Sequence, residues 1–171
     1  MKNTAVKYAM YALRISVIWT IIEHFLGYNT TKHEIGQYTR MLGAIVFYIL
    51  VVVAIYQVRK QQNGSLRFGE GFKTGAIVSV IYSAGVSIWY ALYGEIINTQ
   101  YKPSLLAFER SKLEAAHATP DIIAAKMKEV EMTTGGSVLS YILLFVFMSL
   151  FGIIITAIAS LILKRKKRVE A

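Results

Sequence analysis

Four long apolar stretches, at about residues 7–28, 41–58, 74–98 and 137–163, constrain this chain more than any other feature. The hydrocarbon core of a bilayer is about 30 Å thick, and a helix needs about 20 mostly apolar residues to cross it. The second and fourth stretches contain no charged residue. None of the four alternates apolar and polar residues at every second position, as the strand of a transmembrane barrel does. The sequence therefore predicts an all-α, polytopic membrane protein with four transmembrane helices in a single domain.

The composition excludes several classes of functional site. Hydrophobic residues make up 55% of the 171 residues, more than an ordinary soluble domain carries. The chain has no cysteine, which rules out a disulfide framework, a thiolate zinc site, an iron–sulfur cluster and a cysteine nucleophile. No two histidines stand at a zinc spacing, and the segment at residues 64–71 has no lysine where a phosphate-binding loop requires one. We therefore expect no metal, no cofactor and no enzymatic activity.

Basic residues gather in the segments that four spans place on one side of a membrane. These segments are the N-terminus, the loop after the second span and the C-terminus, and together they hold 11 basic residues against two acidic ones. Loops on the cytoplasmic side carry an excess of Lys and Arg, so we expect both termini to be cytoplasmic. The basic residues are Lys2, Lys7, Arg59, Lys60, Arg67, Lys73, Lys164, Arg165, Lys166, Lys167 and Arg168.

The last five of these residues form a continuous run directly after the fourth span. Such a run can bind nucleic acid or a specific anionic lipid. Because it follows a span at once, we expect it to lie against anionic lipid headgroups of the bilayer and to bind no nucleic acid.

The segment between the third and fourth spans is long and electrically neutral. Residues 99–136 contain five basic and five acidic side chains. Thr119, Pro120 and Asp121 form a strong helix start, with a capping hydroxyl, a proline in the first turn and an acid at the positive end of the helix dipole. Pro103 can start a preceding helix. We expect a helical hairpin at about residues 103–133 on the outer side, either packed on its own bundle or bound to a partner.

Small residues recur along the third span at intervals of four. Gly75, Ser79, Ser83 and Ser87 share one face of a helix, and Gly152 belongs to a similar set in the fourth span. Small residues let helix backbones approach closely in membranes. The first span also carries small residues on one face, whereas the second is bulky. We expect the first, third and fourth spans to pack closely and the second to face lipid.

Three ionisable residues lie near the outer ends of spans. They are Glu23 and His24 in the first span and Glu95 in the third. Ionisable residues inside membranes are candidates for ion or proton pathways. In one interpretation they share an outer vestibule that handles a cation or a proton. In the other they are hydrated interfacial residues that tie helix ends together.

The loop before the third span carries a short aromatic–glycine motif. It reads Phe68-Gly69-Glu70-Gly71-Phe72-Lys73-Thr74-Gly75, or F-x-E-x-F-K-x-G, and Tyr-x-Pro follows at residues 101–103. On these features the chain resembles a family of small bacterial four-span membrane proteins classed as a domain of unknown function. The resemblance implies a location in the bacterial cytoplasmic (inner) membrane. It supplies no activity, cofactor or site residue.

Two classes of function therefore stay open. The first is a non-enzymatic membrane subunit or interaction protein, with a second copy or another membrane protein as partner, since close-packing faces are present and catalytic motifs are not. The second is a small transporter or channel that uses Glu23, His24 and Glu95.

Overall fold

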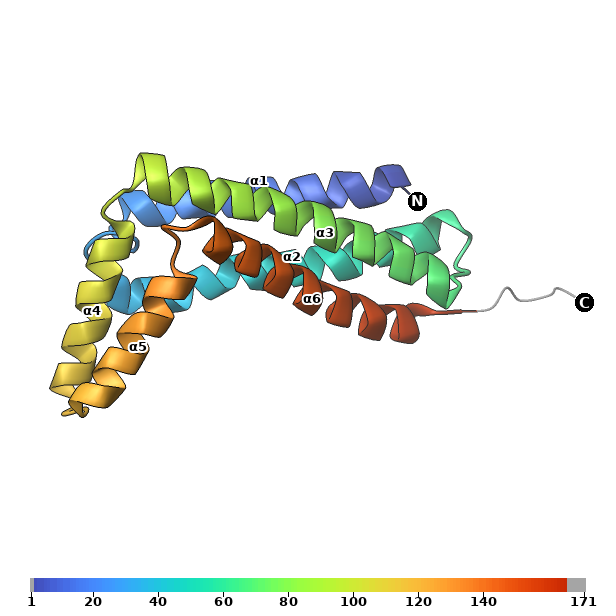
Figure 1. Ribbon diagram of the computed structural model, residues 1–171. Helices are drawn as coiled ribbons and strands as arrows, with labels where there is room; N and C mark the ends of the chain where they lie inside the picture. Colours follow the sequence, from blue (N-terminus) through green and yellow to red (C-terminus); the bar gives the residue numbers. More distant parts are fainter. Residues whose placement is uncertain (1, 166–171) are drawn as a thin grey trace, which may run out of the picture.

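The computed structural model describes residues 2–165, and it is helical almost throughout (Figure 1). Four helices are long and apolar enough to cross a membrane, which confirms that expectation, and they form one bundle. Two shorter helices form a hairpin across one end of the bundle (Figure 1). In chain order the elements are α1 (Lys2–Phe25), α2 (His33–Gln61), α3 (Phe68–Leu92), the π-helix η1 (Tyr93–Ile97), α4 (Tyr101–Ala115), α5 (Pro120–Thr133) and α6 (Val138–Leu163).

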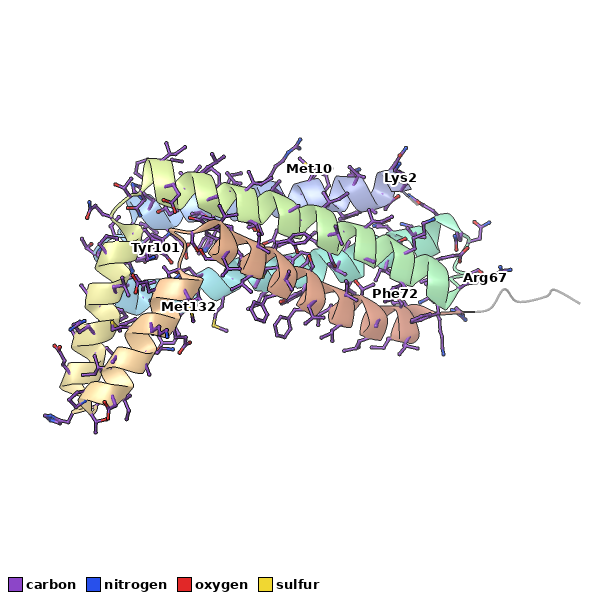
Figure 2. The ribbon with its side chains drawn as sticks, in the orientation of Figure 1. Lys2, Met10, Arg67, Phe72, Tyr101 and Met132 are labelled. Carbon is purple, nitrogen blue, oxygen red and sulfur yellow. The ribbon has the colours of Figure 1, made fainter. Side chains whose placement is uncertain are left out.

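We call the end of the bundle that carries α4 and α5 the hairpin end, and the opposite end the termini end. Lys2 and Arg67 both lie at the termini end, as does the close of α6 (Figure 2). There Leu66 and Arg165 exchange two backbone hydrogen bonds, each 2.9 Å long, in a single antiparallel bridge. The bridge fastens the end of α6 to the connection between α2 and α3. Residues 166–168, which we expect at lipid headgroups, lie outside the described residues.

The helices extend beyond the apolar stretches of the sequence. α1, α2 and α3 begin at Lys2, His33 and Phe68, in place of the expected residues 7, 41 and 74. The segment 29–40, expected as a loop, is therefore largely the first turns of α2. Apolarity marks the part of a helix that lies in hydrocarbon, whereas the helix itself continues through polar turns. Glu34 in the first turn of α2 stabilises that start, because it lies at the positive end of the helix dipole.

The closest helix contact joins α3 and α6, which run antiparallel. A Cβ atom added at Gly75 would lie 2.5 Å from a side-chain oxygen of α6, and one added at Gly152 would lie 2.6 Å from a side-chain oxygen of α3. Neither position has room for a side chain, so glycine is what allows the two backbones to approach. Three pairs of residues face each other across this contact, and each pair lies four residues further along α3 and four residues earlier in α6 than the one before. The pairs are Gly71 with Ser160, Gly75 with Thr156, and Ser79 with Gly152.

The second span does not face lipid more than the others, contrary to expectation. α2 contacts α1, α3 and α6, whereas α1 packs chiefly on α2 and α3. The bulky side chains of α2 fill the space that the small residues of its neighbours leave. Phe47, for example, stacks on Tyr82 of α3 with ring centroids 4.0 Å apart. The side chains of α2 that are 0% exposed are Phe47, Val51, Ala54, Ile55 and Val58.

Replacing Gly152 by alanine is expected to lower the unfolding temperature in detergent. The added carbon would lie 2.7 Å from Cβ of Ser79 and 2.9 Å from the Phe47 ring, so the helices must separate. Overpacking of this kind costs about 1–3 kcal/mol. Gly69→Ala is the matched control, because a Cβ there meets nothing within 4 Å. An unfolding temperature that stays the same or rises in Gly152→Ala would show that this contact does not limit stability.

Candidate functional site

Polar side chains gather inside the bundle at the hairpin end, where α1 stops. α1 ends at Phe25 because Gly27 adopts φ +81°, a conformation that glycine reaches without strain. The backbone N–H of Tyr28 then donates a hydrogen bond of 2.8 Å to the carbonyl of Glu23. This turn carries Asn29 back against the helix it has just left. The result is a buried cluster whose members, each at most 5% exposed, are Glu23, Asn29, Tyr93 and Asn98.

Glu23 lies at the centre of this cluster, with 1% of its surface exposed. Its Oε1 accepts a hydrogen bond from the Thr39 hydroxyl at 2.5 Å, and its Oε2 accepts one from Nδ2 of Asn29 at 3.3 Å. Thr39 belongs to the polar first turns of α2. The carboxylate therefore joins the end of α1, the connection that follows it and α2. Buried charges in proteins are stabilised by such hydrogen bonds.

His24 joins the same cluster through η1. Its Nδ1 lies 3.0 Å from the Tyr93 hydroxyl. Nδ2 of Asn98 donates both to that hydroxyl, at 3.0 Å, and to the backbone oxygen of Asn29, at 2.9 Å. Because the Tyr93 oxygen accepts from Asn98, its own hydrogen is available for His24. Hydrogen bonds thus run without a break from Glu23 through Asn29, Asn98 and Tyr93 to His24.

Glu95 makes hydrogen bonds to other partners than Glu23 does. It is exposed, and its Oε1 accepts from the Tyr141 hydroxyl at 2.6 Å and from the backbone N–H of Gly136 at 2.9 Å. These bonds tie η1 to the start of α6, and Glu23 shares none of these partners. Glu95 belongs to η1, a π-helix whose turn is wider than that of α3. Glu23 and Glu95 thus differ in burial and in hydrogen-bond partners, and a shared outer vestibule stays a prediction.

Residues of α2 expected in a loop hold the hairpin to the bundle. Nε2 of His33 lies 2.8 Å from the Ser104 hydroxyl of α4. Arg40 donates from Nη1 to the Tyr101 hydroxyl, and its guanidinium carbon lies 5.7 Å from the centre of that ring. Tyr101 lies where the hairpin meets the bundle (Figure 2). Burial raises the pKa of the Tyr101 phenol, and Arg40 acts in the opposite direction. The phenol thus keeps its hydrogen at neutral pH.

A cavity of about 300 Å³ lies between the bundle and the base of the hairpin. Every helix of the fold contributes to its wall. The wall is largely aromatic and apolar, and Arg40 is its single charged residue among the residues that the structure describes. The lining residues are Ser16, Trp19, Arg40, Gly43, Ala44, Tyr82, Val86, Tyr90, Tyr93, Gly94, Tyr101, Leu105, Thr133, Thr134, Gly135, Ser140, Tyr141, Leu144 and Met148.

The helix-packing residues expected from the sequence lie elsewhere in the bundle. Gly75, Ser79, Ser83 and Ser87 are all buried on α3, and Gly152 is buried on α6. Within residues 2–165, no three His, Asp or Glu side chains come together in a way that could hold a metal ion. The hairpin end can bind polar groups through the Arg40 guanidinium, which keeps N–H donors beyond those given to Gly36 and Tyr101, and through several phenols.

The residues of this end that sequence reasoning missed include Arg40, Tyr93, Asn98 and Tyr101. Arg40 falls just before the apolar stretch at residues 41–58, so the hydropathy pattern assigns it to no helix. The aromatic partners carry no spacing signal, since 61 residues separate Arg40 from Tyr101. The available signal was the unusual number of tyrosines, 11 in a chain of this length, which need hydrogen-bond partners when buried.

Glu23→Gln is expected to lower the free energy of unfolding by about 1–3 kcal/mol, because a buried carboxylate loses charge-assisted hydrogen bonds. Glu95→Gln is expected to have a smaller effect, since that side chain is exposed. The two effects are expected to add, because the carboxylates share no partner. A double-mutant cycle on detergent unfolding measures this. A coupling energy above about 0.5 kcal/mol would place both acids in one site.

Comparison with families of known proteins identifies one match. Residues 7–165 match the family described as "Protein of unknown function (DUF4199)". No curated protein and no solved structure matches the chain. The matched region contains most of the described bundle, the hairpin and the residues that line the cavity. The chain is a member of the DUF4199 family.

Proposed function

We propose that this chain is a non-enzymatic integral membrane protein that acts as a subunit or interaction protein. The four long helices form its membrane domain, and the α4–α5 hairpin is its docking element for a partner protein. The observation that supports this function most directly is the position of the hairpin. It crosses the end of the bundle and extends beyond it (Figure 1).

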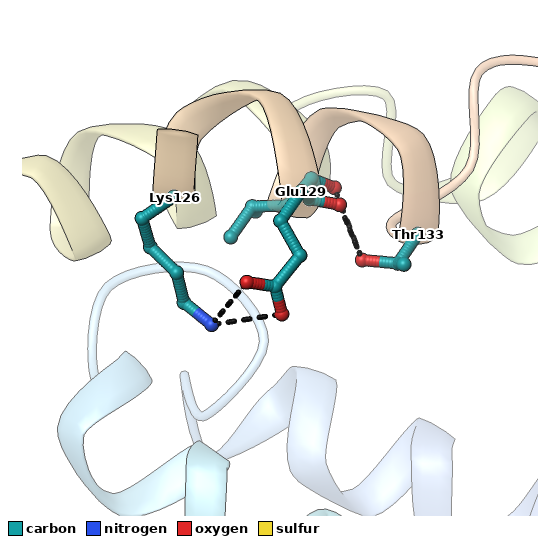
Figure 3. Close-up of polar contacts among 4 residues, drawn as sticks. Lys126, Glu129 and Thr133 are labelled. Atoms are coloured by element: carbon teal, nitrogen blue, oxygen red, sulfur yellow. Dashed lines mark hydrogen bonds and ion pairs between the residues drawn. The ribbon is translucent and has the colours of Figure 1, made fainter. Parts of the chain in front are cut away.

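The hairpin contacts the bundle only through part of its length. α4 contacts α2, and α5 contacts α6, while the two hairpin helices contact each other. Lys126 and Glu129 form the one ion pair found within residues 2–165, and both belong to α5 (Figure 3). A pair this exposed and this local stabilises the helix by a few tenths of a kcal/mol at most. The hairpin is thus held by its base, by the contact between its own helices and by a hydrogen bond of 3.1 Å from Lys112 of α4 to Gln37 of α2.

Apolar side chains remain uncovered on the hairpin. Ile122 and Met132 of α5 are each 54% exposed. Two packed helices bury only the faces that they turn toward each other, so the outer faces gain free energy when a third element covers them. The segment is also neutral overall, which suits a mixed polar and apolar protein surface better than an anionic lipid surface.

A photoreactive residue in place of Ile122 is expected to form one discrete adduct with a protein in native membranes. The same residue in place of Ile158, which is 50% exposed on α6, is the control and should react with lipid alone. Met132→Asp should abolish the Ile122 adduct without lowering the unfolding temperature. If the Ile122 position reacts only with lipid, the hairpin lies on the membrane and is not a docking element.

The orientation that we propose places both termini in the cytoplasm and the hairpin outside, in the bacterial cytoplasmic membrane. Its support is the charge at the termini end, where the described residues include Lys2, Lys7, Arg59, Lys60, Arg67, Lys73, Lys164 and Arg165. Cytoplasmic flanks of membrane helices carry this excess.

The absence of native cysteine allows this orientation to be measured directly. In intact cells, Asn63→Cys at the termini end should resist an impermeant thiol reagent, because the cytoplasm is closed to it. Ala116→Cys at the tip of the hairpin should react. Both should react after the membrane is permeabilised. Reaction of Asn63→Cys in intact cells, with Ala116→Cys protected, would reverse the proposed orientation.

A small transporter is the second candidate function, and the buried hydrogen-bonded network that runs from Glu23 to His24 favours it. In that case Glu23, His24 and Glu95 would handle the coupled cation or proton. Uptake that needs Glu23 in sealed vesicles, together with a hairpin that captures no protein, would support transport over docking.

A further inference from the structure

Arg40 is a half-buried cation with no partner of opposite charge among the residues that the structure describes. It forms no ion pair with any residue from 2 to 165. Its Nε–H donates to the Gly36 carbonyl at 2.9 Å, and one Nη1–H donates to Tyr101. A guanidinium has five N–H donors in a planar fork, so three of them make no hydrogen bond within the described protein. An arginine near a membrane interior normally pairs with a carboxylate, a phosphate or backbone carbonyls.

The two carboxylates described at the hairpin end already accept hydrogen bonds from other groups. Both oxygens of Glu23 accept hydrogen bonds from Thr39 and Asn29, and Glu95 accepts from Tyr141 and Gly136. Neither acid lines the cavity, whereas Arg40 does. The cavity therefore presents positive charge and no negative charge, which favours an anion and disfavours a cation.

The rest of the cavity wall suits the body of a ligand. Val86, Leu144 and Met148 supply an apolar surface, and Tyr82, Tyr90 and Trp19 supply aromatic faces. Its volume of about 300 Å³ is at the lower end of the range for small-molecule sites. A site of this kind holds an apolar body in its walls and orients the ligand with a few polar groups.

Gly43 leaves the cavity open on the α2 side. A Cβ atom there would meet only the Ser16 hydroxyl, at 3.8 Å, which is an ordinary contact. The helix thus has room for a side chain at this position, unlike Gly75 and Gly152 in the α3–α6 contact. A larger residue at position 43 would extend into the cavity and occupy it.

We propose that this cavity binds an anionic amphiphile, a molecule with a carboxylate or phosphate head on an apolar body, and that Arg40 binds the head. This proposal is independent of whether the hairpin docks a partner. The ligand enters either as a free carboxylate from outside or as an anionic lipid from the bilayer, and both present the same chemistry to Arg40.

Binding can be measured with phenylpropionate as the anion and phenylpropionamide as its neutral isostere. The protein is reconstituted in phosphatidylcholine nanodiscs and carries Trp89→Phe, so that Trp19 in the cavity wall is the single tryptophan. Phenylpropionate is expected to change Trp19 fluorescence saturably. The amide is expected to bind roughly tenfold more weakly or worse, because it cannot form the charge-assisted pair.

Two variants test the site in different ways, one by removing its charge and the other by filling its space. Arg40→Gln should weaken phenylpropionate binding roughly tenfold or more, while Arg110→Gln, the same charge change on the exposed face of α4, should not. Gly43→Leu keeps Arg40 but fills the cavity, so it should abolish binding and raise the unfolding temperature. Equal binding of acid and amide, unchanged binding in Arg40→Gln, full binding in Gly43→Leu, or no binding to the parent protein would each overturn the proposal.

The lipid composition separates the two sources of the ligand. If an anionic lipid is the native occupant, nanodiscs that contain phosphatidylglycerol should weaken phenylpropionate binding by competition, and Arg40→Gln should remove this effect. If the native occupant is a free carboxylate, phosphatidylglycerol should leave phenylpropionate binding unchanged.

Discussion

The contact between α3 and α6 is the constraint on which the rest of the bundle depends. In a bilayer, lipid tails are as apolar as the helices, so burial alone does not draw helices together. Close approach of the backbones does draw helices together. In this bundle, glycines that face hydroxyl-bearing residues at four-residue steps allow that approach. Bulky residues of α2 then fill the remaining space, and α1 packs on α2 and α3. The hairpin end is organised only because these helices are already fixed.

The short aromatic–glycine motif at residues 68–75 has a structural explanation in the same contact. Glu70 accepts a hydrogen bond from the backbone N–H of Arg67 at 2.9 Å, which satisfies a free donor at the start of α3. Gly71 then makes the first close approach to α6 and to Ile55 of α2, and Gly75 makes the next. Phe68 and Phe72 stack with ring centroids 5.7 Å apart. The motif thus starts α3 and sets its crossing with α6, and these contacts give it a structural role.

The main features of the fold follow from the sequence, because length and apolarity decide which segments can cross a bilayer. The small-residue face of α3 was also recognisable, since its period matches a helix. The packing role of α2 was not recognisable from the sequence, because a bulky apolar side chain suits lipid and protein neighbours equally well. At the hairpin end, Glu23 and His24 were identified from their charge. Their partners depend on a turn at Gly27 and on a π-helix, and neither leaves a clear period in the sequence.

The connection between α3 and α6 also has a consequence for how the chain is made. α3 ends at Leu92 and α6 begins only at Val138, with the whole hairpin between them. Synthesis proceeds from the N-terminus, so α3 enters the bilayer well before its partner exists. Until α6 arrives, the glycine and serine face of α3 has lipid neighbours that offer no hydrogen bonds. Arg165, which bridges to Leu66, is synthesised only after α6. The unfinished protein is therefore a three-helix species in which the small polar face of α3 is exposed to lipid. Membrane quality control would first encounter a defective chain in this state, before the mature bundle forms.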